Sequence, residues 1–347
     1  MKKFDIFIWA SDYEEFTGEG LLARCFIKNY FFGSNLKVKI LSNYGVYFYK
    51  YKSVTIKKKK YTNTWLTKYF SPFLGIIYIW FYYIKGKKVC YLNYLPLWNF
   101  FIFLLIPKNT ILGPITGSLY KDKIYNFNTF IRKFLFPFSY FLSLKIIFYR
   151  FKNIIFSTDN LKNVIKKNKI KFCLFNFCYL FFKKRKIIKK DIDFIFYIRK
   201  HPLKFNYLYQ FVIKQLVSRG FKIVVVGDKF VYPKVSNYIN LPRFRLLKIL
   251  DRTKYTIASD ENFFSLFTLD SLASGLFIFY NQQKFFNNYN INNFIPLKFS
   301  NYNYSMNKII SCTKRKLSLS NKSAEDFFCK QNYKIQKRLK LISRNIL

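Results

Sequence analysis

The feature that most constrains the fold is the alternation of short apolar runs with longer apolar stretches along the chain. Short apolar runs are typical of buried strands, and the longer stretches have the length of helices. We expect strands in the first half at 4–9, 37–41, 88–93, 110–112 and 154–156, and helices near 20–30, 65–84, 97–105 and 128–148. Strand and helix in succession predict a parallel sheet with covered faces.

A second series of the same kind begins near residue 191. Strands are expected at 194–198, 221–226, 255–258 and 276–280, and helices at 206–219, 245–252 and 267–273, whereas the polar tract 281–303 is expected to be a loop. The predicted fold class is therefore α/β, with two doubly wound, Rossmann-like domains that face each other across a ligand cleft. The predicted domains are 1–165 and 191–322, joined by a Lys-rich linker at 166–190 and followed by a basic helix at 323–347.

The chain is strongly basic. Of its 347 residues, 61 are Lys or Arg and 16 are Asp or Glu, which gives a formal net charge of +45. The residue types that A/T-rich codons encode are abundant, so coding bias accounts for part of this excess. The rest must be solvated or neutralised by an anionic partner, either nucleic acid or the anionic face of a membrane. We expect an anionic membrane surface and no nucleic acid, because no nucleic-acid-binding motif is found.

Cysteine and histidine usage indicates neither disulfides nor a metal site. The six cysteines are scattered and His201 is the single histidine, which is typical of buried thiols in a cytoplasmic protein. Asp5 interrupts the apolar start of the chain, which favours a first strand over a signal peptide. The uncharged segment 69–84 contains Pro72 and is shorter than the about 20 residues that a membrane span needs. We expect a buried or membrane-surface helix there, and a peripheral location on the inner face of the cell membrane.

The most specific string in the chain is 259–275. It follows a predicted strand, enters a predicted helix and ends at Gly275. The backbone N–H groups and the positive end of such a helix favour an anionic ligand. Asp270 lies far enough along the helix to touch a different part of the same ligand. An ordinary strand-to-helix turn, without a site, is the alternative.

This string resembles the donor-site motif of retaining glycosyltransferases of the two-Rossmann (GT-B) type, the glycosyl-transferase group 1 (family 4-like) enzymes. Their pattern is Glu-Gly-Phe-Gly-Leu-Pro-x-x-Glu-Ala-x-Ala-x-Gly. In an ungapped alignment Asn262 takes the place of the first Glu, and Ser265 and Leu266 take those of the second Gly and the Leu. Asp270 falls on the last Glu, and the resemblance implies that it holds the ribose of the nucleotide. It also implies a donor-sugar contact at Asn262, where an amide supplies no charge, or at the neighbouring Glu261.

Two cations follow the first predicted strand of the second half. Arg199 and Lys204 are similar to the Arg and Lys that hold the donor diphosphate in the same family. A guanidinium binds phosphate oxygens in a bidentate manner, and an ammonium acts as a point charge. The resemblance implies that these catalytic residues stabilise the departing diphosphate without a metal, so no metal and no other cofactor are expected.

Glycines mark a candidate acceptor-side loop in the first half. Gly18 and Gly20 lie between the first predicted strand and helix, where glycine permits close approach of the backbone to a ligand. The loop is similar to the first loop of the same enzymes. A second turn, from Gly113 to Gly117, is either a tight structural turn or a substrate contact.

These features predict a glycosyltransferase of the hexosyltransferase type that moves a sugar from a nucleotide-diphosphate sugar to a glycan or lipid-linked acceptor. Cell-surface polysaccharide or lipopolysaccharide synthesis is the expected setting, and the resemblance implies retention of anomeric configuration. Two alternatives stay open. A basic nucleic-acid-binding protein would explain the charge and the interleaved aromatics. A degenerate transferase-like protein that binds sugar nucleotide without turnover would explain Asn262.

Overall fold

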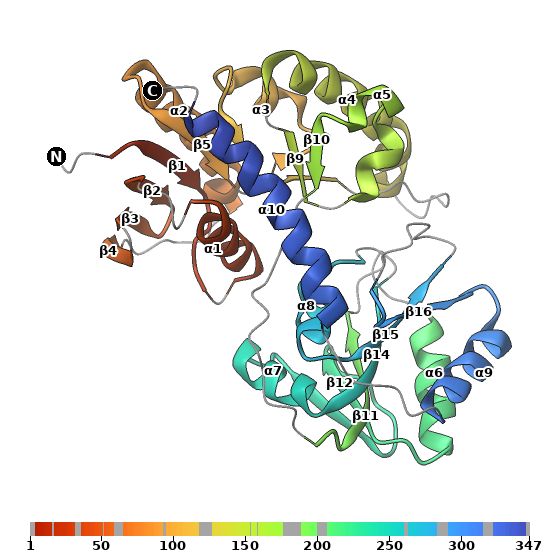
Figure 1. Cartoon of the computed structure of the whole chain (residues 1–347). Coiled ribbons are helices and arrows are strands. Elements are labelled where there is room, and N and C mark those ends of the chain that lie inside the picture. The colour runs from red at the N-terminus through yellow and green to blue at the C-terminus, as the bar shows by residue number, and fades with distance from the viewer. Residues whose placement is uncertain are drawn as a thin grey trace. The chain divides into compact units, whose positions relative to one another are not determined.

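The computed structural model shows the chain as two compact units (Figure 1). It describes residues 4–15, 17–31, 36–50, 52–58, 65–92, 95–117, 127–152, 154–157, 159–175, 189–199, 207–259, 263–282, 291–314 and 322–344. Unit 1 comprises Met1–Tyr179 and Gln331–Leu347, and unit 2 comprises Leu180–Lys330. The division falls inside the segment that the sequence predicts as a linker.

Unit 1 is built on parallel strands. Its first sheet has the order β4-β3-β2-β1-β5-β7, with β1 (Ile6–Ala10), β2 (Val38–Ser42), β3 (Gly45–Lys50), β4 (Lys52–Lys58), β5 (Lys88–Leu92) and β7 (Ile111–Leu112). Its second sheet has the order β10-β9-β8-β6, with β6 (Leu95–Pro96), β8 (Ile115–Thr116), β9 (Ile154–Phe156) and β10 (Cys173–Phe175). All pairs are parallel except β2 with β3 and β3 with β4. Since β6 and β8 follow directly after β5 and β7 in the chain, the second sheet continues the first.

Helices cover both faces of these strands. They are α1 (Gly18–Tyr30), α2 (Trp65–Ile84), α3 (Phe100–Leu105), α4 (Phe127–Arg150) and the short η1 (Asp159–Val164) and α5 (Lys167–Ile170). Successive side chains of a strand point to opposite faces. Ile6 and Ile8 of β1 accordingly pack in one core with α1, while Phe7 and Trp9 pack in another core with α2, α3 and α4.

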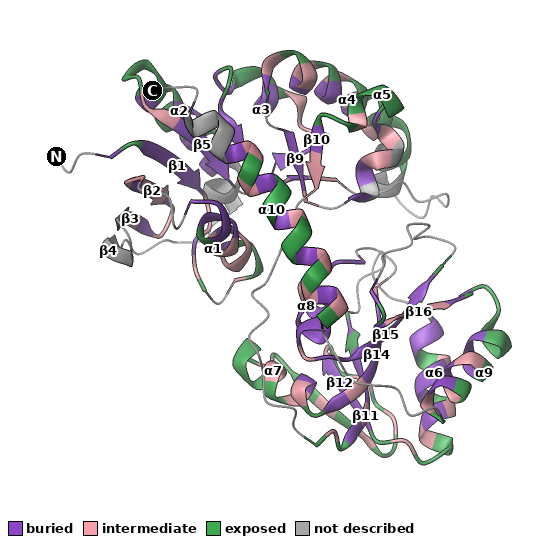
Figure 2. Cartoon of the chain, in the orientation of Figure 1, coloured by how far each residue is buried: buried purple, intermediate pink, exposed green. Residues whose placement is uncertain are grey.

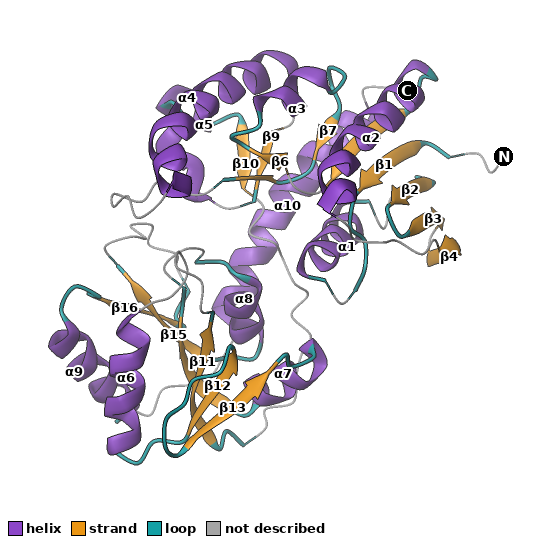
Figure 3. Cartoon of the chain, turned by 180° about the vertical axis from the view of Figure 1, so that it is seen from behind, coloured by secondary structure: helices purple, strands orange, loops and turns teal. Residues whose placement is uncertain are grey.

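Unit 2 contains one sheet of parallel strands in the order β13-β12-β11-β14-β15-β16. The strands are β11 (Ile192–Ile198), β12 (Ile223–Gly227), β13 (Val235–Ile239), β14 (Thr253–Ile257), β15 (Phe277–Asn281) and β16 (Phe294–Leu297). In chain order this is the Rossmann arrangement, and the strand order reverses between β11 and β14. Helices α6 (Tyr207–Ser218) and α9 (Tyr302–Thr313) cover one face, and α7 (Arg243–Asp251) and α8 (Leu266–Ala273) cover the other (Figure 3).

The last helix, α10 (Lys322–Arg344), contributes residues to both units. Phe328, near its start, packs edge-on against Phe264 of unit 2 with 5.8 Å between ring centroids. Ile335, farther along, enters the α1 core of unit 1, where the Tyr30 hydroxyl donates a hydrogen bond of 2.8 Å to Asn332 Oδ1. This helix lies where the sequence predicts a basic helix.

The predicted α/β class with two Rossmann-like sheets is confirmed by the strand orders. The loop prediction for 281–303 is wrong at Phe294–Leu297, which forms the edge strand β16 through parallel pairing with β15. Among the described helices, none combines the length and the hydropathy that crossing a bilayer requires.

Candidate functional site

The candidate site lies at the carboxyl edge of the unit 2 sheet, where β11 and β14 end. In open α/β sheets, ligands bind at the point where the strand order reverses. Gly227 ends the neighbouring strand β12 with a φ of 99°, and a Cβ there would lie 2.3 Å from the Ile198 carbonyl oxygen. The Asp228 N–H donates to the same oxygen at 2.9 Å. A glycine is therefore required to hold the ends of β11 and β12 together at this edge.

Helix α8 begins beside the end of β11. Ser265 is its N-cap, and the Ser265 Oγ accepts a hydrogen bond of 3.2 Å from the Thr268 N–H. Phe267, in the first turn, stacks on Tyr197 of β11 with 5.3 Å between ring centroids. The N–H groups of a first helical turn lack intrahelical partners and favour an anion. The positive end of α8, including Ser265 and Leu266, thus lies at the switch point of the sheet.

Lys190 holds the other end of the same helix. Its Nζ donates to the carbonyl oxygens of Thr253 at 2.6 Å and Ser274 at 2.9 Å, and Ser274 is the C-cap of α8. Burial lowers the pKa of Lys190 to about 8, although the nearby Asp251 opposes this shift. A cation at the carboxyl end of a helix also complements the helix dipole. Helix α8 is therefore fixed at both ends.

Asp270 is buried in α8 and forms an ion pair that sequence reasoning did not identify. Its Oδ1 accepts from Arg243 Nη2 at 2.6 Å, and its Oδ2 accepts from Arg243 Nε at 3.1 Å. The side chain of Asp270 is 4% exposed and that of Arg243 is 39% exposed. Arg243 begins α7, which follows β13, so its guanidinium also belongs to the carboxyl edge of the sheet. The bidentate pair neutralises the buried carboxylate.

The other predicted site residues of unit 2 are only partly placed. Arg199 directly follows β11 and is exposed. Lys204, Glu261 and Asn262 lie outside the described residues, as does His201. The phosphate, ribose and donor-sugar contacts assigned to these positions and to Asp270 stay predictions.

In unit 1, Gly20 serves close packing within the chain. It lies in the first turn of α1, where its N–H donates to the Thr17 Oγ1 at 3.1 Å, and Gly18 is the first residue of that helix. A Cβ at Gly20 would lie 2.2 Å from the Glu14 carbonyl oxygen. The close backbone approach that glycine permits here is therefore made by the loop between β1 and α1. A contact of Gly18 or Gly20 with an acceptor stays a prediction.

A tyrosine cluster fixes this loop. Arg24 Nε donates to the Tyr13 carbonyl oxygen at 2.6 Å, and its guanidinium carbon lies 4.5 Å from the centre of the Tyr13 ring. The Tyr47 hydroxyl donates to Glu14 Oε1 at 3.0 Å. Burial raises the pKa of Tyr47 to about 12 and also raises the pKa of Tyr13, where Tyr49 adds to the effect. These phenols stay protonated at neutral pH and act as hydrogen-bonding groups.

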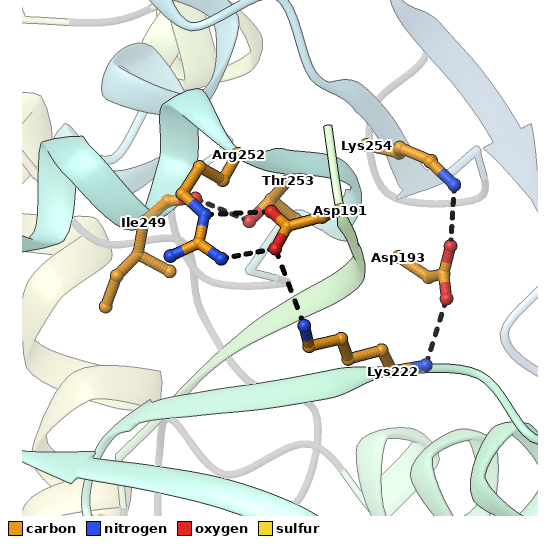
Figure 4. Close-up of polar contacts among 7 residues, drawn as sticks. All are labelled: Asp191, Asp193, Lys222, Ile249, Arg252, Thr253 and Lys254. Carbon is orange, nitrogen blue, oxygen red and sulfur yellow. Dashed lines mark hydrogen bonds and ion pairs between the residues drawn. The ribbon is translucent and has the colours of Figure 1, made fainter. Parts of the chain in front are cut away.

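The amino edge of the unit 2 sheet carries a separate group of ion pairs (Figure 4). Arg252 Nε donates to Asp191 Oδ1 at 2.8 Å, and this hydrogen-bonded pair lowers the pKa of Asp191. Lys254 Nζ donates to Asp193 Oδ1 at 2.8 Å, and the Lys222 N–H donates to Asp193 Oδ2 at 2.9 Å. These acids join the starts of β11, β12 and β14, at the opposite edge from the candidate site. Over the described part of the chain, no group of three or more His, Cys, Asp or Glu residues is arranged to hold a metal.

No protein-family model matches the chain, and no curated protein matches it at a significant level. Among solved structures, it is similar to the UDP-GlcNAc 2-epimerase of Methanocaldococcus jannaschii in complex with UDP-GlcNAc and UDP, with 10% identity, a TM-score of 0.48, and 98% of this chain and 99% of that one covered. It is similar to an alpha-glucosyltransferase in complex with UDP and a DNA 13-mer, with 10% identity, a TM-score of 0.45, and 97% and 95% covered. It is also similar to the GtfA/B complex, with 10% identity, a TM-score of 0.49, and 86% of this chain and 65% of that one covered. At these identities and TM-scores, the likenesses assign no activity to the chain.

Proposed function

We propose that the chain is a glycosyltransferase that binds a nucleotide-diphosphate sugar at the carboxyl edge of the unit 2 sheet. One observation carries this proposal: helix α8, which forms the second half of the string 259–275 that resembles the donor-site motif, begins beside the end of β11 at the topological switch point. The motif and the strand order are independent features of the chain, and both indicate an anionic ligand at the same place.

The residues of this edge suit the parts of such a donor. The N–H groups of the first turn of α8, beyond the Ser265 cap, and the cations Arg199 and Lys204 would bind the diphosphate and stabilise it as it departs. Asp270, with its partner Arg243, would hold the ribose. Because cations and a helix end supply the positive charge, the reaction needs no metal at this site.

The finer parts of the proposal follow from the motif. Asn262 or Glu261 would contact the donor sugar, and the reaction would transfer a hexose with retention of configuration. The acceptor would be a glycan or a lipid-linked sugar bound at the start of α1, around Gly18 and Gly20, as in the synthesis of cell-surface polysaccharide or lipopolysaccharide. Asn262 stands where the family pattern has a Glu, and its amide supplies no charge. This difference favours a second candidate, a protein that binds the sugar nucleotide without turnover.

A thermal-shift screen against nucleoside diphosphates and sugar nucleotides tests donor binding, because a ligand at 100 times its dissociation constant stabilises the folded state by about 2.7 kcal/mol. We expect Arg199→Ala to weaken binding of the best nucleotide by about 1.5–3 kcal/mol, as loss of a charged hydrogen bond does. Arg219→Ala is the matched control, because Arg219 is also an exposed arginine of unit 2. It lies between α6 and the amino end of β12, at the edge of the sheet opposite the candidate site.

Two results would contradict parts of the proposal. Unchanged nucleotide affinity in an Arg199→Ala/Lys204→Ala variant would refute the phosphate assignment. Tight nucleotide binding without hydrolysis of the sugar nucleotide, and without transfer to lipid-linked acceptors, would favour the protein that binds without turnover.

A further inference from the structure

An exposed apolar face covers one side of unit 1. Helices α2, α3 and α4 pack on the same side of the sheet, where Ile79, Phe103 and Ile147 are fully buried in a shared core. Their outward sides carry large apolar side chains in place of the polar ones usual for surface helices. Those more than half exposed include Phe70, Ile77 and Ile84 of α2, Phe101 of α3, and Phe134 and Phe138 of α4. We call this surface the outer apolar face.

Its residues recur at helical spacing. Phe70, Ile77 and Ile84 are seven residues apart, so they form one stripe along α2. Phe134 and Phe138 are one turn apart on α4. Exposed residues recur along both helices in Figure 2. The exposure therefore belongs to whole helix faces.

The three helices form one surface. Trp80 Nε1 of α2 donates to the carbonyl oxygen of Leu105 at the end of α3 at 2.8 Å. Trp98, just before α3, stacks on Phe136 of α4 with 5.9 Å between ring centroids. Among the described side chains of these helices, twelve aromatic ones are between 37% and 82% exposed: Phe70, Phe73, Tyr78, Trp80, Phe81, Tyr83, Phe101, Phe130, Phe134, Phe138, Phe141 and Tyr149. An aromatic side chain carries about 150–250 Å² of surface, so together they present roughly 1,000 Å². The largest apolar patch on a typical monomer is about 300–600 Å².

The charge of this face complements an anionic partner. Helices α2, α3 and α4 contain no acidic residue. Lys85 Nζ lies 3.9 Å from the centre of the Phe81 ring, and Lys145 Nζ lies 4.3 Å from that of Phe141. Apolar side chains with cations among them suit the interface of a bilayer that contains anionic lipid. Two copies of the face would bring like charges together. Nucleic acid would leave the exposed aliphatic side chains Ile77 and Ile84 without an apolar partner, which the acyl chains of a bilayer supply.

We propose that the outer apolar face docks unit 1 on an anionic lipid bilayer, with α2, α3 and α4 lying in the interface. The cytoplasmic leaflet of the cell membrane has this chemistry. The inference uses residues of α2, α3 and α4 only, so it does not depend on the transfer reaction proposed for unit 2.

Co-sedimentation of the full chain with lipid vesicles tests the proposal. We expect binding at least about tenfold tighter to phosphatidylcholine mixed with phosphatidylglycerol than to phosphatidylcholine alone, because each cation near an anionic surface adds about 1 kcal/mol. The variant Ile77→Ser/Phe101→Ser/Phe138→Ser should bind at least about tenfold more weakly, since each change removes apolar area from the interface. The control variant Val231→Ser/Tyr333→Ser removes exposed apolar side chains outside the face and should bind as the wild type does.

Three outcomes would overturn the proposal. They are no vesicle binding by the wild type, equal binding to the two lipid compositions, and unchanged binding of the triple Ser variant. Self-association or RNA binding that the triple Ser variant loses, without vesicle binding by the wild type, would assign the face to another partner. If the Ser variant fails to fold by circular dichroism, Lys85→Gln/Lys145→Gln replaces it, and its anionic-vesicle binding must fall for the proposal to stand.

Discussion

Replacing Asp270 with Asn removes the negative charge that holds Arg243 at the start of α7. The Asn side chain keeps the size but cannot accept the two charged hydrogen bonds of 2.6 and 3.1 Å. Breaking a fully buried ion pair costs about 3–5 kcal/mol. Because the Arg243 side chain is 39% exposed, water solvates the released guanidinium in part, and we expect a loss of about 1–3 kcal/mol in the free energy of unfolding.

Urea unfolding followed by circular dichroism measures this loss. A double-mutant cycle with Asp270→Asn and Arg243→Gln should give a coupling energy of about 1 kcal/mol or more, as residues in one ion pair do. The control is Asp193→Asn, which disturbs the more exposed pair with Lys254 and should cost about 1 kcal/mol or less. Additive single changes, or equal costs for the two Asp→Asn variants, would refute the reasoning.

Calorimetry with a 2′,3′-dideoxy nucleoside diphosphate separates the ribose contact from this structural role. If Asp270 accepts from the ribose hydroxyls, the wild type prefers the natural nucleotide by about 1–3 kcal/mol, and Asp270→Asn loses that preference. The same preference in both proteins would leave Asp270 as the partner of Arg243 alone.

Two further changes test the residues that hold the strands and helix α8 in place around the site. Gly227→Ala should lower the free energy of unfolding of unit 2 by more than the about 1–2 kcal/mol that a left-handed backbone costs a non-glycine residue, because the new Cβ would also clash with the Ile198 carbonyl oxygen. The control is Gly220→Ala, because Gly220 also has a positive φ but no atom lies within 4 Å of the new Cβ. Urea unfolding of the control therefore measures the cost of the backbone conformation without the clash. For Lys190, burial lowers the folded pKa to about 8, below the about 10.4 of an unfolded lysine, so the unfolded chain binds more protons between these values. The stability of the wild type relative to Lys190→Met should therefore rise from pH 8 to about pH 10.4, and a flat difference would contradict the assignment.

The buried strands could be predicted from the sequence because strands covered on both faces form continuous apolar runs. The runs at 194–198 and 221–226 correspond to β11 and β12. The edge strands β4, β13 and β16 were not predicted, for the opposite reason, whereas the edge strand β7 was predicted at 110–112. β4 is Lys-rich, and β16 lies in an Asn-rich tract and is defined by its pairing with β15. Pairing between distant segments leaves little trace in local composition.

For the candidate site too, local features could be predicted from the sequence, whereas contacts between distant residues could not. The motif at 259–275 placed α8 after β14 and put Asp270 in the helix, because strand, turn and helix are local features. Arg243, its partner, is 27 residues earlier, and no local pattern connects the two. The segment 241–250 resembles the loop and helix that precede the donor site in the same family, and this resemblance is the signal in the sequence that points to this region. The packing role of Gly20 likewise depends on the loop at Glu14 folding back over α1.

A buried ion pair is weak evidence for stability, since well-packed apolar residues of similar volume often serve a fold equally well. The pair of Asp270 and Arg243 therefore favours a ligand role, because its partly exposed guanidinium lies at the edge where an anionic nucleotide would bind. The variant Arg243→Met/Asp270→Leu tests this reasoning. We expect its unfolding free energy to lie within about 1–2 kcal/mol of the wild type, while each single change costs more because it removes one charge of the pair and keeps the other. Nucleoside diphosphate affinity should fall by at least about tenfold, as the loss of a charged hydrogen bond implies. A double variant that is stable and still binds the nucleotide with wild-type affinity would show that the pair serves packing alone.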